Sequence, residues 1–258
     1  MNEPASLFTN QSVIITGGAS GIGRASALRM AKAGAKVAVV DINEANIHAT
    51  LAEIEHAYPG TATLGIRTDV RVPGQVDAMA AQVHETFGRI DILVHSAGVL
   101  RPPGSSPRIL PQMETADCDA LIDINLKGTF LCDRAVLQFM MAQRSGQILN
   151  IASTSGLKGI AFDSVYCASK FGVVGLTESL AEEVRPFGIR VHLLLPDAVA
   201  TPLWDTNIAG APAGSLQPDR VAHVIELMLG LPEDMILSNV VVAPFKTRRR
   251  KKKDSAET

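Results

Sequence analysis

Cysteine is scarce in this 258-residue chain, with three copies at positions 118, 132 and 167. Three widely spaced thiols build neither a disulfide framework nor a zinc site, which favours a reducing, cytoplasmic compartment. The six histidines form no close pair of ligands, so we expect no metal. His95 and His192 stand in apolar strand-like runs, and we interpret both as structural residues.

The chain also lacks a long hydrophobic run. No apolar stretch approaches the ~20 residues that cross a membrane, so we expect no membrane span. The start, "MNEPASLFTN", has neither a basic region nor an apolar core, and we expect no signal peptide. Apolar residues make up 47% and charged residues 19%, which is typical of a compact globular protein rather than a disordered one.

Positive charge is scarce in the body of the chain and concentrated at its end. Residues 246–258, "KTRRRKKKDSAET", hold seven of the 24 basic and two of the 26 acidic residues. The rest therefore has 17 basic and 24 acidic residues, a net charge of −7. Such a tail is either a solvated, disordered extension or a phosphate-binding segment, and we favour the first. We expect one domain over residues 1–245, followed by this tail.

Short apolar runs alternate with longer amphipathic ones. Strands are predicted at 12–16, 36–40, 61–66, 91–95, 146–153, 189–195 and 237–243, and helices at 21–33, 44–57, 73–87, 115–143, 164–185 and 218–229. The strands are nearly continuous in apolar residues, which indicates that helices cover both faces of the sheet. The pattern predicts a single-domain α/β fold of the Rossmann-like, doubly wound parallel type with about seven strands.

Two segments interrupt this alternation. Residues 101–111 contain four prolines, and 196–218 are rich in proline, glycine and alanine. Both follow predicted strands at the edge where such sheets bind ligands, so we interpret them as substrate-facing loops. Leu100, Leu203, Trp204 and Ile208 predict an apolar wall there.

A glycine-rich turn, "TGGASGIG" (16–23), joins the first predicted strand to the first helix. Gly17, Gly21 and Gly23, with Ser20 and Ile22 between them, would bring backbone N–H groups to a pyrophosphate at the positive end of a helix. Asp41 ends the second strand, where a carboxylate accepts hydrogen bonds from ribose hydroxyls and repels a 2′-phosphate. The alternative role for Asp41 is a helix N-cap. We expect NAD as the cofactor.

Tyr166 and Lys170 stand four residues apart in a predicted helix, with only small residues between them. The spacing places both side chains on one face. Hydride transfer at a carbon bearing oxygen needs a general acid/base, and a nearby ammonium lowers the pKa of a phenol. Ser153 follows the fifth strand and could hydrogen-bond the substrate oxygen.

These motifs together resemble the short-chain dehydrogenase/reductase family over residues 10–245. The resemblance rests on "TGGASGIG", Asp41, "DV" (69–70), "AG" (97–98), "INLKG" (124–128), "NIAS" (150–153) and "YCASK" (166–170). It implies a catalytic tetrad of Asn125, Ser153, Tyr166 and Lys170. Tyr166 would be the acid/base, Lys170 would hold the nicotinamide ribose, and Asn125 would bind a relay water through its backbone.

The resemblance implies further cofactor contacts and an assembly. Asp69 and Val70 would meet the adenine, Ala97 and Gly98 would border the cofactor, and Thr201 would bind the nicotinamide carboxamide. A homotetramer or dimer would form through the helices at 115–143 and 164–185. Ser96 stands where the family usually has asparagine, and Asp197 where it usually has glycine next to the pocket.

The leading hypothesis is an NAD(H)-dependent oxidoreductase that interconverts a secondary alcohol and a ketone. A second is an NADP-linked reductase of carrier-bound 3-oxoacyl groups, which Asp41 and the acidic body disfavour. A third is a non-catalytic protein that senses nucleotides or binds nucleic acid through the tail. The intact tetrad disfavours it, and we expect a small-molecule substrate without nucleic acid as a partner.

Overall fold

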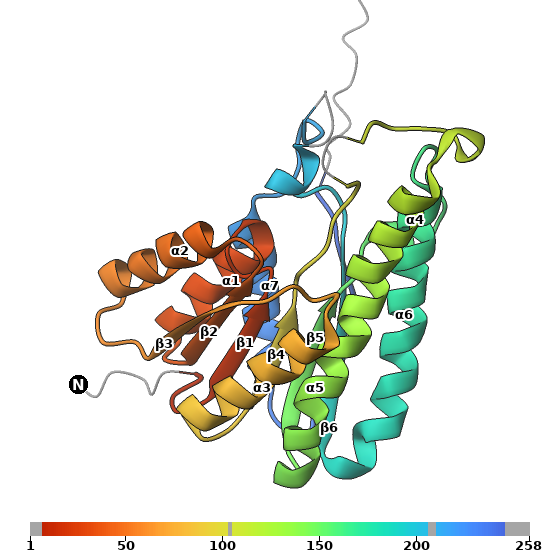
Figure 1. The fold of residues 1–258 in the computed structure, drawn as a ribbon. Coiled ribbons are helices and arrows are strands. Elements are labelled where there is room, and N and C mark those ends of the chain that lie inside the picture. The colour runs from red at the N-terminus through yellow and green to blue at the C-terminus, as the bar shows by residue number, and fades with distance from the viewer. Residues whose placement is uncertain (1–6, 103–104, 206–209, 246–258) are drawn as a thin grey trace, which may run out of the picture.

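A computed structural model describes residues 7–102, 105–205 and 210–245. Within these ranges, seven strands form one sheet in the order β3-β2-β1-β4-β5-β6-β7 (Figure 1). Each neighbouring pair is parallel. The predicted doubly wound parallel fold is confirmed. The basic tail and Ile208 lie outside the described residues.

The strands are short and begin and end close to the predicted positions. Their bounds are β1 Ser12–Thr16, β2 Lys36–Asp41, β3 Thr63–Arg67, β4 Ile92–His95, β5 Gly146–Ile151, β6 Ile189–Pro196 and β7 Asn239–Val242. The strand order reverses between β1 and β4, because β2 and β3 extend to one side and β4 to β7 to the other. Ligands of such sheets bind at the carboxyl ends of the strands near this reversal.

The α-helices fill the intervals between strands. Their bounds are α1 Gly21–Lys32, α2 Glu44–Ala57, α3 Pro73–Phe87, α4 Thr115–Ile122, α5 Gly128–Gln143, α6 Ser164–Val184 and α7 Pro218–Leu229. None of the described helices is long and apolar enough to cross a bilayer.

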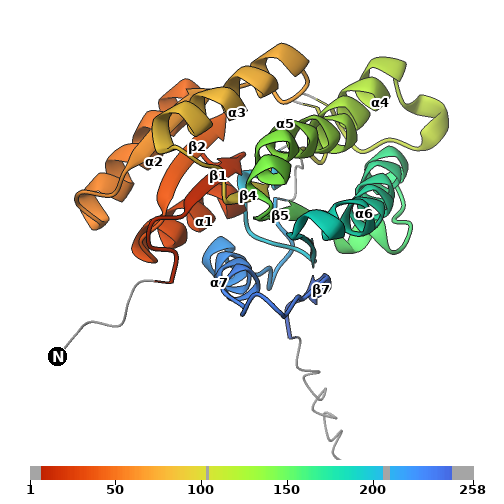
Figure 2. The same cartoon turned by 90° about the horizontal axis from the view of Figure 1, so that it is seen from below.

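Helices cover both faces of the sheet (Figure 2). On one face, α1, α2 and α7 pack over an apolar cluster that contains Val13, Ile15 and Val37. On the other face, α3, α5 and α6 pack over a second cluster that contains Ile14 and Leu93. Neighbouring residues of β1 therefore bury their side chains in different layers, which explains why the strand is apolar at successive positions.

The predicted helix over 115–143 differs from the structure in one respect. A π-helical turn, Asp123–Lys127, separates α4 from α5. The hydroxyl of Thr129, in the first turn of α5, donates to the backbone carbonyl of Asn125 in this turn at 2.7 Å. The sequence pattern predicted one continuous helix here, and a π-helical turn is a rare single-turn insertion within such a helix.

The segments 101–111 and 196–218 are largely irregular, as predicted. In its described part the first contains only a 3-10 turn that begins at Leu110. Between the end of β6 and the start of α7, the described residues of the second form only a 3-10 turn, Pro202–Trp204, and an isolated bridge between Val199 and Leu216. Both segments lie above the carboxyl ends of the strands, at the top of Figure 1.

A polar cluster lies between α5, β5 and α6 beneath this edge. The Asn150 amide donates to the Asp133 carboxylate at 2.9 Å and to the Thr177 hydroxyl at 3.1 Å. Asp133 is 2% exposed. Burial raises its pKa to about 7, an effect larger than the opposing hydrogen bond from Asn150. The folded protein therefore holds the proton of this carboxyl more tightly than the unfolded chain does.

We predict that the wild type loses stability as the pH is raised, and that Asp133→Asn removes this pH dependence. Because the folded pKa lies above the unfolded value near 4, the wild type loses stability relative to the variant between about pH 4 and pH 7, by up to about 4 kcal/mol. Urea unfolding of both proteins at several pH values measures the difference. Asp77→Asn, at an exposed position, is the control. Its stability should depend on pH in the same way as that of the wild type. A constant difference between Asp133→Asn and the wild type would contradict the prediction.

Candidate active site

A cleft of about 1090 Å³ opens at the carboxyl ends of the strands. This is at the upper end of the range for ligand pockets, about 300–1,000 Å³. The cleft is lined by these residues proposed from the sequence: Gly17, Ser20, Gly21, Ile22, Asp41, Asp69, Val70, Ala97, Gly98, Ser153, Tyr166, Lys170 and Thr201. Gly23 and Asn125 support the wall from behind and do not line it.

The glycine turn is held too tightly for side chains. A Cβ atom at Gly17, whose φ is +62°, would lie 2.8 Å from the amide nitrogen of Ala97. A Cβ atom at Gly23 would overlap the carbonyl of Gly17. The first turn of α1 therefore presents bare backbone to the cleft. The Ser20 hydroxyl does not cap this helix, which leaves the N-terminal N–H groups for an anion such as a pyrophosphate.

Asp41 faces the same end of the cleft. Its carboxylate accepts hydrogen bonds from the backbone N–H of Ala19 at 3.2 Å and of Asn43 at 3.1 Å. The alternative role as a helix N-cap does not apply, because Asn43 caps α2 through Asn46. The two bonds fix the carboxylate at the end of β2 and leave each oxygen with acceptor capacity for a ribose hydroxyl.

The Asp69 side chain has a partner that the sequence did not indicate. Arg71, which also lines the cleft, lies 2.6 Å from this carboxylate. The Arg71 hydrogen bonds lower the pKa of Asp69, more strongly than burial raises it. The predicted contact of Asp69 with an adenine therefore competes with this ion pair. Val70 is buried, and its side chain packs against Gly128 at the start of α5.

Tyr166 and Ser153 meet at the other end of the cleft. Tyr166 is 7% exposed. Burial raises the pKa of its phenol to about 12, against a smaller lowering by a hydrogen bond with Ser153. The Ser153 hydroxyl also accepts from the backbone N–H of Ser155 at 3.1 Å. The sequence predicted that Lys170 would lower the phenol pKa, but here burial dominates and the opposing effect comes from Ser153.

Lys170 lies on the same face of α6, one turn from the tyrosine. Its ammonium donates to the carbonyl of Ile151 at 3.1 Å and stands 5.8 Å from the centre of the Tyr166 ring. Burial lowers the pKa of Lys170 to about 8. The ammonium lies beside Gly98, because a Cβ atom added at Gly98 would be 3.5 Å from Nζ of Lys170.

Asn125 braces the loop after β4. Its side chain exchanges two hydrogen bonds with the backbone of Val99, at 2.8 and 2.9 Å, and donates to Ser169 at 3.1 Å. The π-helical turn aims this amide at the loop. The neighbouring His95 is buried and bonded to the Thr16 hydroxyl at 2.8 Å. Burial lowers the pKa of His95 to about 3, so this histidine is neutral.

The two irregular segments close the substrate end. Leu100, Leu203 and Trp204 pack around Tyr166 in one apolar cluster, as the sequence suggested. Thr201 lies over the glycine turn, since a Cβ at Gly21 would meet its side chain at 3.1 Å. Asp197 lines the cleft and accepts from the Thr154 hydroxyl at 3.4 Å.

Sequence reasoning missed a pair of charged residues at this end. Arg101, in the loop after β4, forms an ion pair with Asp163, immediately before α6. Both residues line the cleft together with Tyr166. The sequence did contain one signal for Arg101. It is a charged residue directly after the apolar Leu100, in a loop interpreted as facing the substrate. Their pairing was not predictable because 62 residues separate them.

The described residues contain no group of three or more metal-ligating side chains. The cleft instead combines bare backbone at a helix N-terminus, a fixed carboxylate at the end of β2 and a buried Tyr–Ser–Lys group. This arrangement fits a dinucleotide, and it defines a nucleotide-binding oxidoreductase.

Comparison with known proteins identifies the family. The model of the short chain dehydrogenase family matches residues 11–211. The (2S)-[(R)-hydroxy(phenyl)methyl]succinyl-CoA dehydrogenase subunit BbsD of Thauera aromatica is 39% identical over 225 residues, which cover 84% of this chain and 88% of that protein. The chain belongs to the short chain dehydrogenase family.

Solved structures agree with this assignment. The crystal structure of levodione reductase superposes with a TM-score of 0.83 at 32% identity, over 91% of this chain and 96% of that one. A metagenomic short-chain oxidoreductase in complex with NADP gives a TM-score of 0.80 at 32% identity, over 93% and 100%. Members of the family bind a nicotinamide cofactor.

We predict that Gly23→Ala abolishes cofactor binding and destabilises the fold. The added methyl group would overlap the Gly17 carbonyl and push the turn out of its conformation. Gly74→Ala, in the first turn of α3 where nothing lies within 4 Å of the added atom, is the control and should gain up to about 1 kcal/mol from helix propensity. Thermal melting and NADH fluorescence titration measure both effects. Unchanged NADH affinity in Gly23→Ala would contradict the role of the turn.

Proposed function

We propose that this protein is an NAD(H)-dependent oxidoreductase that interconverts a secondary alcohol and a ketone, with Tyr166 as the acid/base. The observation that carries this proposal is the buried phenol, bonded to Ser153 and one helical turn from the Lys170 ammonium, inside a cleft that also contains the glycine turn. Relatives named as a dehydrogenase and a reductase support the same chemistry.

Each polar group at this end has a distinct task in the proposal. Bound nicotinamide supplies the hydride acceptor or donor. Tyr166 gives a proton to the ketone oxygen or takes one from the alcohol, and Ser153 hydrogen-bonds that oxygen as its charge changes. Lys170 holds the ribose and offers a positive charge near the phenol. The backbone carbonyl of Asn125, in the π-helical turn, would bind a water of the proton relay.

The raised pKa of Tyr166 suits the reduction direction. A phenol that stays protonated at neutral pH is the acid that a ketone needs as it gains hydride. Oxidation requires the phenolate, so its rate should rise with pH. The Lys170 ammonium, with a pKa lowered to about 8, favours the phenolate only while it stays protonated.

Asp41 supports a preference for NAD. Its carboxylate is fixed by two backbone N–H groups at the point where β2 delivers it to the cleft. A 2′-phosphate would place a second anion beside it. Arg24 does not compensate, because it pairs with Glu53 of α2. A solved relative binds NADP, so the preference is tested directly below.

We further propose a homo-oligomer, a tetramer or a dimer, and a cytoplasmic location. Exposed apolar side chains on α5 and α6, among them Phe130 at 45% and Phe171 at 46% exposure, support an interface on these helices. The three cysteines are free, which suits a reducing compartment.

We predict that Tyr166→Phe lowers kcat at least 100-fold and leaves NADH affinity nearly unchanged. The phenol oxygen transfers the proton, whereas the ring fills the same space in both proteins. A panel of secondary alcohols with NAD, read by absorbance of the reduced cofactor, provides the substrate. Tyr58→Phe, at the only other tyrosine, is the control and should retain full activity. More than a tenth of the wild-type kcat in Tyr166→Phe would overturn the acid/base assignment.

We predict that the wild type prefers NAD to NADP about 100-fold in kcat/KM, from a few kcal/mol of charge repulsion at Asp41. Asp41→Ala should reduce this preference at least tenfold. Glu44→Ala removes an acid from the first turn of α2, outside the cleft lining, and should keep the preference. Both cofactors are assayed with one substrate. An unchanged ratio in Asp41→Ala would show that the residue does not read the ribose.

A further inference from the structure

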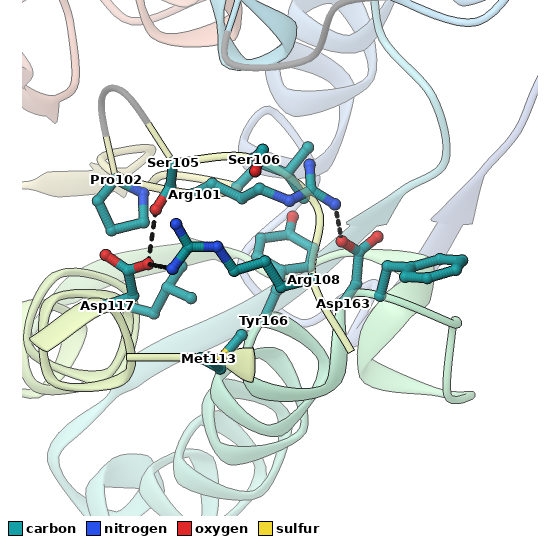
Figure 3. A pocket seen from close by; sticks show the side chains of 12 residues that line it. Arg101, Pro102, Ser105, Ser106, Arg108, Met113, Asp117, Asp163 and Tyr166 are labelled. Atoms are coloured by element: carbon teal, nitrogen blue, oxygen red, sulfur yellow. Dashed lines mark hydrogen bonds and ion pairs between the residues drawn. The ribbon is translucent and has the colours of Figure 1, made fainter. Parts of the chain in front are cut away.

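The Arg101–Asp163 ion pair forms part of the wall beside Tyr166. Figure 3 shows the guanidinium of Arg101 next to the phenol, with Asp163 beyond it. The two side chains are 10% and 16% exposed. Long charged side chains are almost never this buried unless their polar atoms are satisfied.

One end of this arginine is not satisfied. Nη2 of Arg101 bonds to Asp163, but Nη1 is buried and has no hydrogen-bond partner. A buried charged donor without an acceptor costs free energy comparable to or greater than a normal hydrogen bond. Arg101 itself lines the cleft, so an acceptor oxygen on a bound substrate would satisfy this buried donor once the guanidinium turns toward the cleft.

Asp163 is held in place at a cost to the local structure. It occupies the N-cap position of α6, yet its side chain makes no capping hydrogen bond. Such a cap is typically worth about 1 kcal/mol. The preceding residue, Phe162, has a φ of +69°, a strained conformation for a bulky side chain. The Asp163 carboxylate pairs with Arg101 instead of capping its own helix.

The charge around this position discriminates between ligands. Asp163 already neutralises the guanidinium, and Asp197 lies in the same cleft, bonded to Thr154 beside Ser153. Burial is the largest cause of the raised pKa of Tyr166, and the negative charge of Asp163 raises it further. An anionic substrate would meet two carboxylates here, whereas an uncharged oxygen would gain the hydrogen bond without repulsion.

We propose that Arg101 determines substrate specificity by donating from Nη1 to a second, uncharged oxygen of the substrate, a hydroxyl or a carbonyl near the reacting carbon. The substrate class is then a diol, a hydroxyketone or a diketone rather than a monofunctional alcohol or an acid. This inference rests on the proposed function, because it assumes that the reacting carbon lies beside Tyr166.

The test compares three alcohols that differ only in the neighbouring group: cyclohexane-1,2-diol, cyclohexanol and 2-hydroxycyclohexanecarboxylate. We expect the wild type to oxidise the diol with a kcat/KM at least tenfold above that of the other two. Arg101→Met should reduce this preference about 10- to 100-fold, the effect of losing one hydrogen bond from a charged donor. Because the result is a ratio of two substrates, a loss of folded enzyme cancels.

Two further variants complete the design. Arg108→Met is the matched control. Arg108 lines a small pocket together with Arg101 and Tyr166 (Figure 3), pairs with Asp117 and Glu114, and does not line the cleft. It should keep the wild-type preference. Asp163→Asn removes one carboxylate and should raise kcat/KM for the acid relative to the diol.

The outcomes separate this inference from the proposed function. Turnover of cyclohexanol and the diol with equal kcat/KM, or a preference that persists in Arg101→Met, would overturn the role of Arg101 and leave the proposed function standing. A wild type that favours the acid would show that the arginine reads an anion, which also overturns the inference. No cofactor-linked turnover of any alcohol would overturn the proposed function, and the inference with it.

Discussion

A side chain at Gly17 would place its first carbon 2.8 Å from the amide of Ala97, and this close approach of two backbones shapes the whole site. It brings the end of β1 against the end of β4 at the point where the strand order reverses. Because no side chain intervenes, the N-terminus of α1 opens directly into the cleft, with Asp41 on one side and the Tyr166 group on the other. The positions of these groups depend on the turn, and the turn depends on the sheet that holds both strands in register.

Burial and charge oppose each other throughout this edge of the sheet. Desolvation raises the pKa of Tyr166 and Asp133 and lowers that of Lys170 and His95. Each shift favours the neutral form, as expected where water is excluded. The same exclusion of water makes any unpaired donor, such as Nη1 of Arg101, more consequential.

Three departures from the local optimum occur at the substrate end. An uncapped N-cap aspartate, a phenylalanine in the left-handed region and a buried donor without a partner all occur within one side of the cleft. Comparable departures also lie outside this region, for example Arg144 at a φ of +53°, whereas Asn43 caps α2. Conflict between local preference and the final structure is expected at functional positions, since selection there acts on the ligand rather than on the fold alone.

The sequence by itself determined the alternation of strands and helices, the glycine turn, Asp41 and the Tyr–Lys spacing. These features are local, because strand and helix periodicities and the i, i+4 relation act within a few residues. It did not determine the π-helical turn at Asn125, the pairing of Asp69 with Arg71 or the direction of the Tyr166 pKa shift. Tertiary structure decided these and the Arg101–Asp163 pair, because burial and long-range contacts exist only after the loops have packed over the sheet.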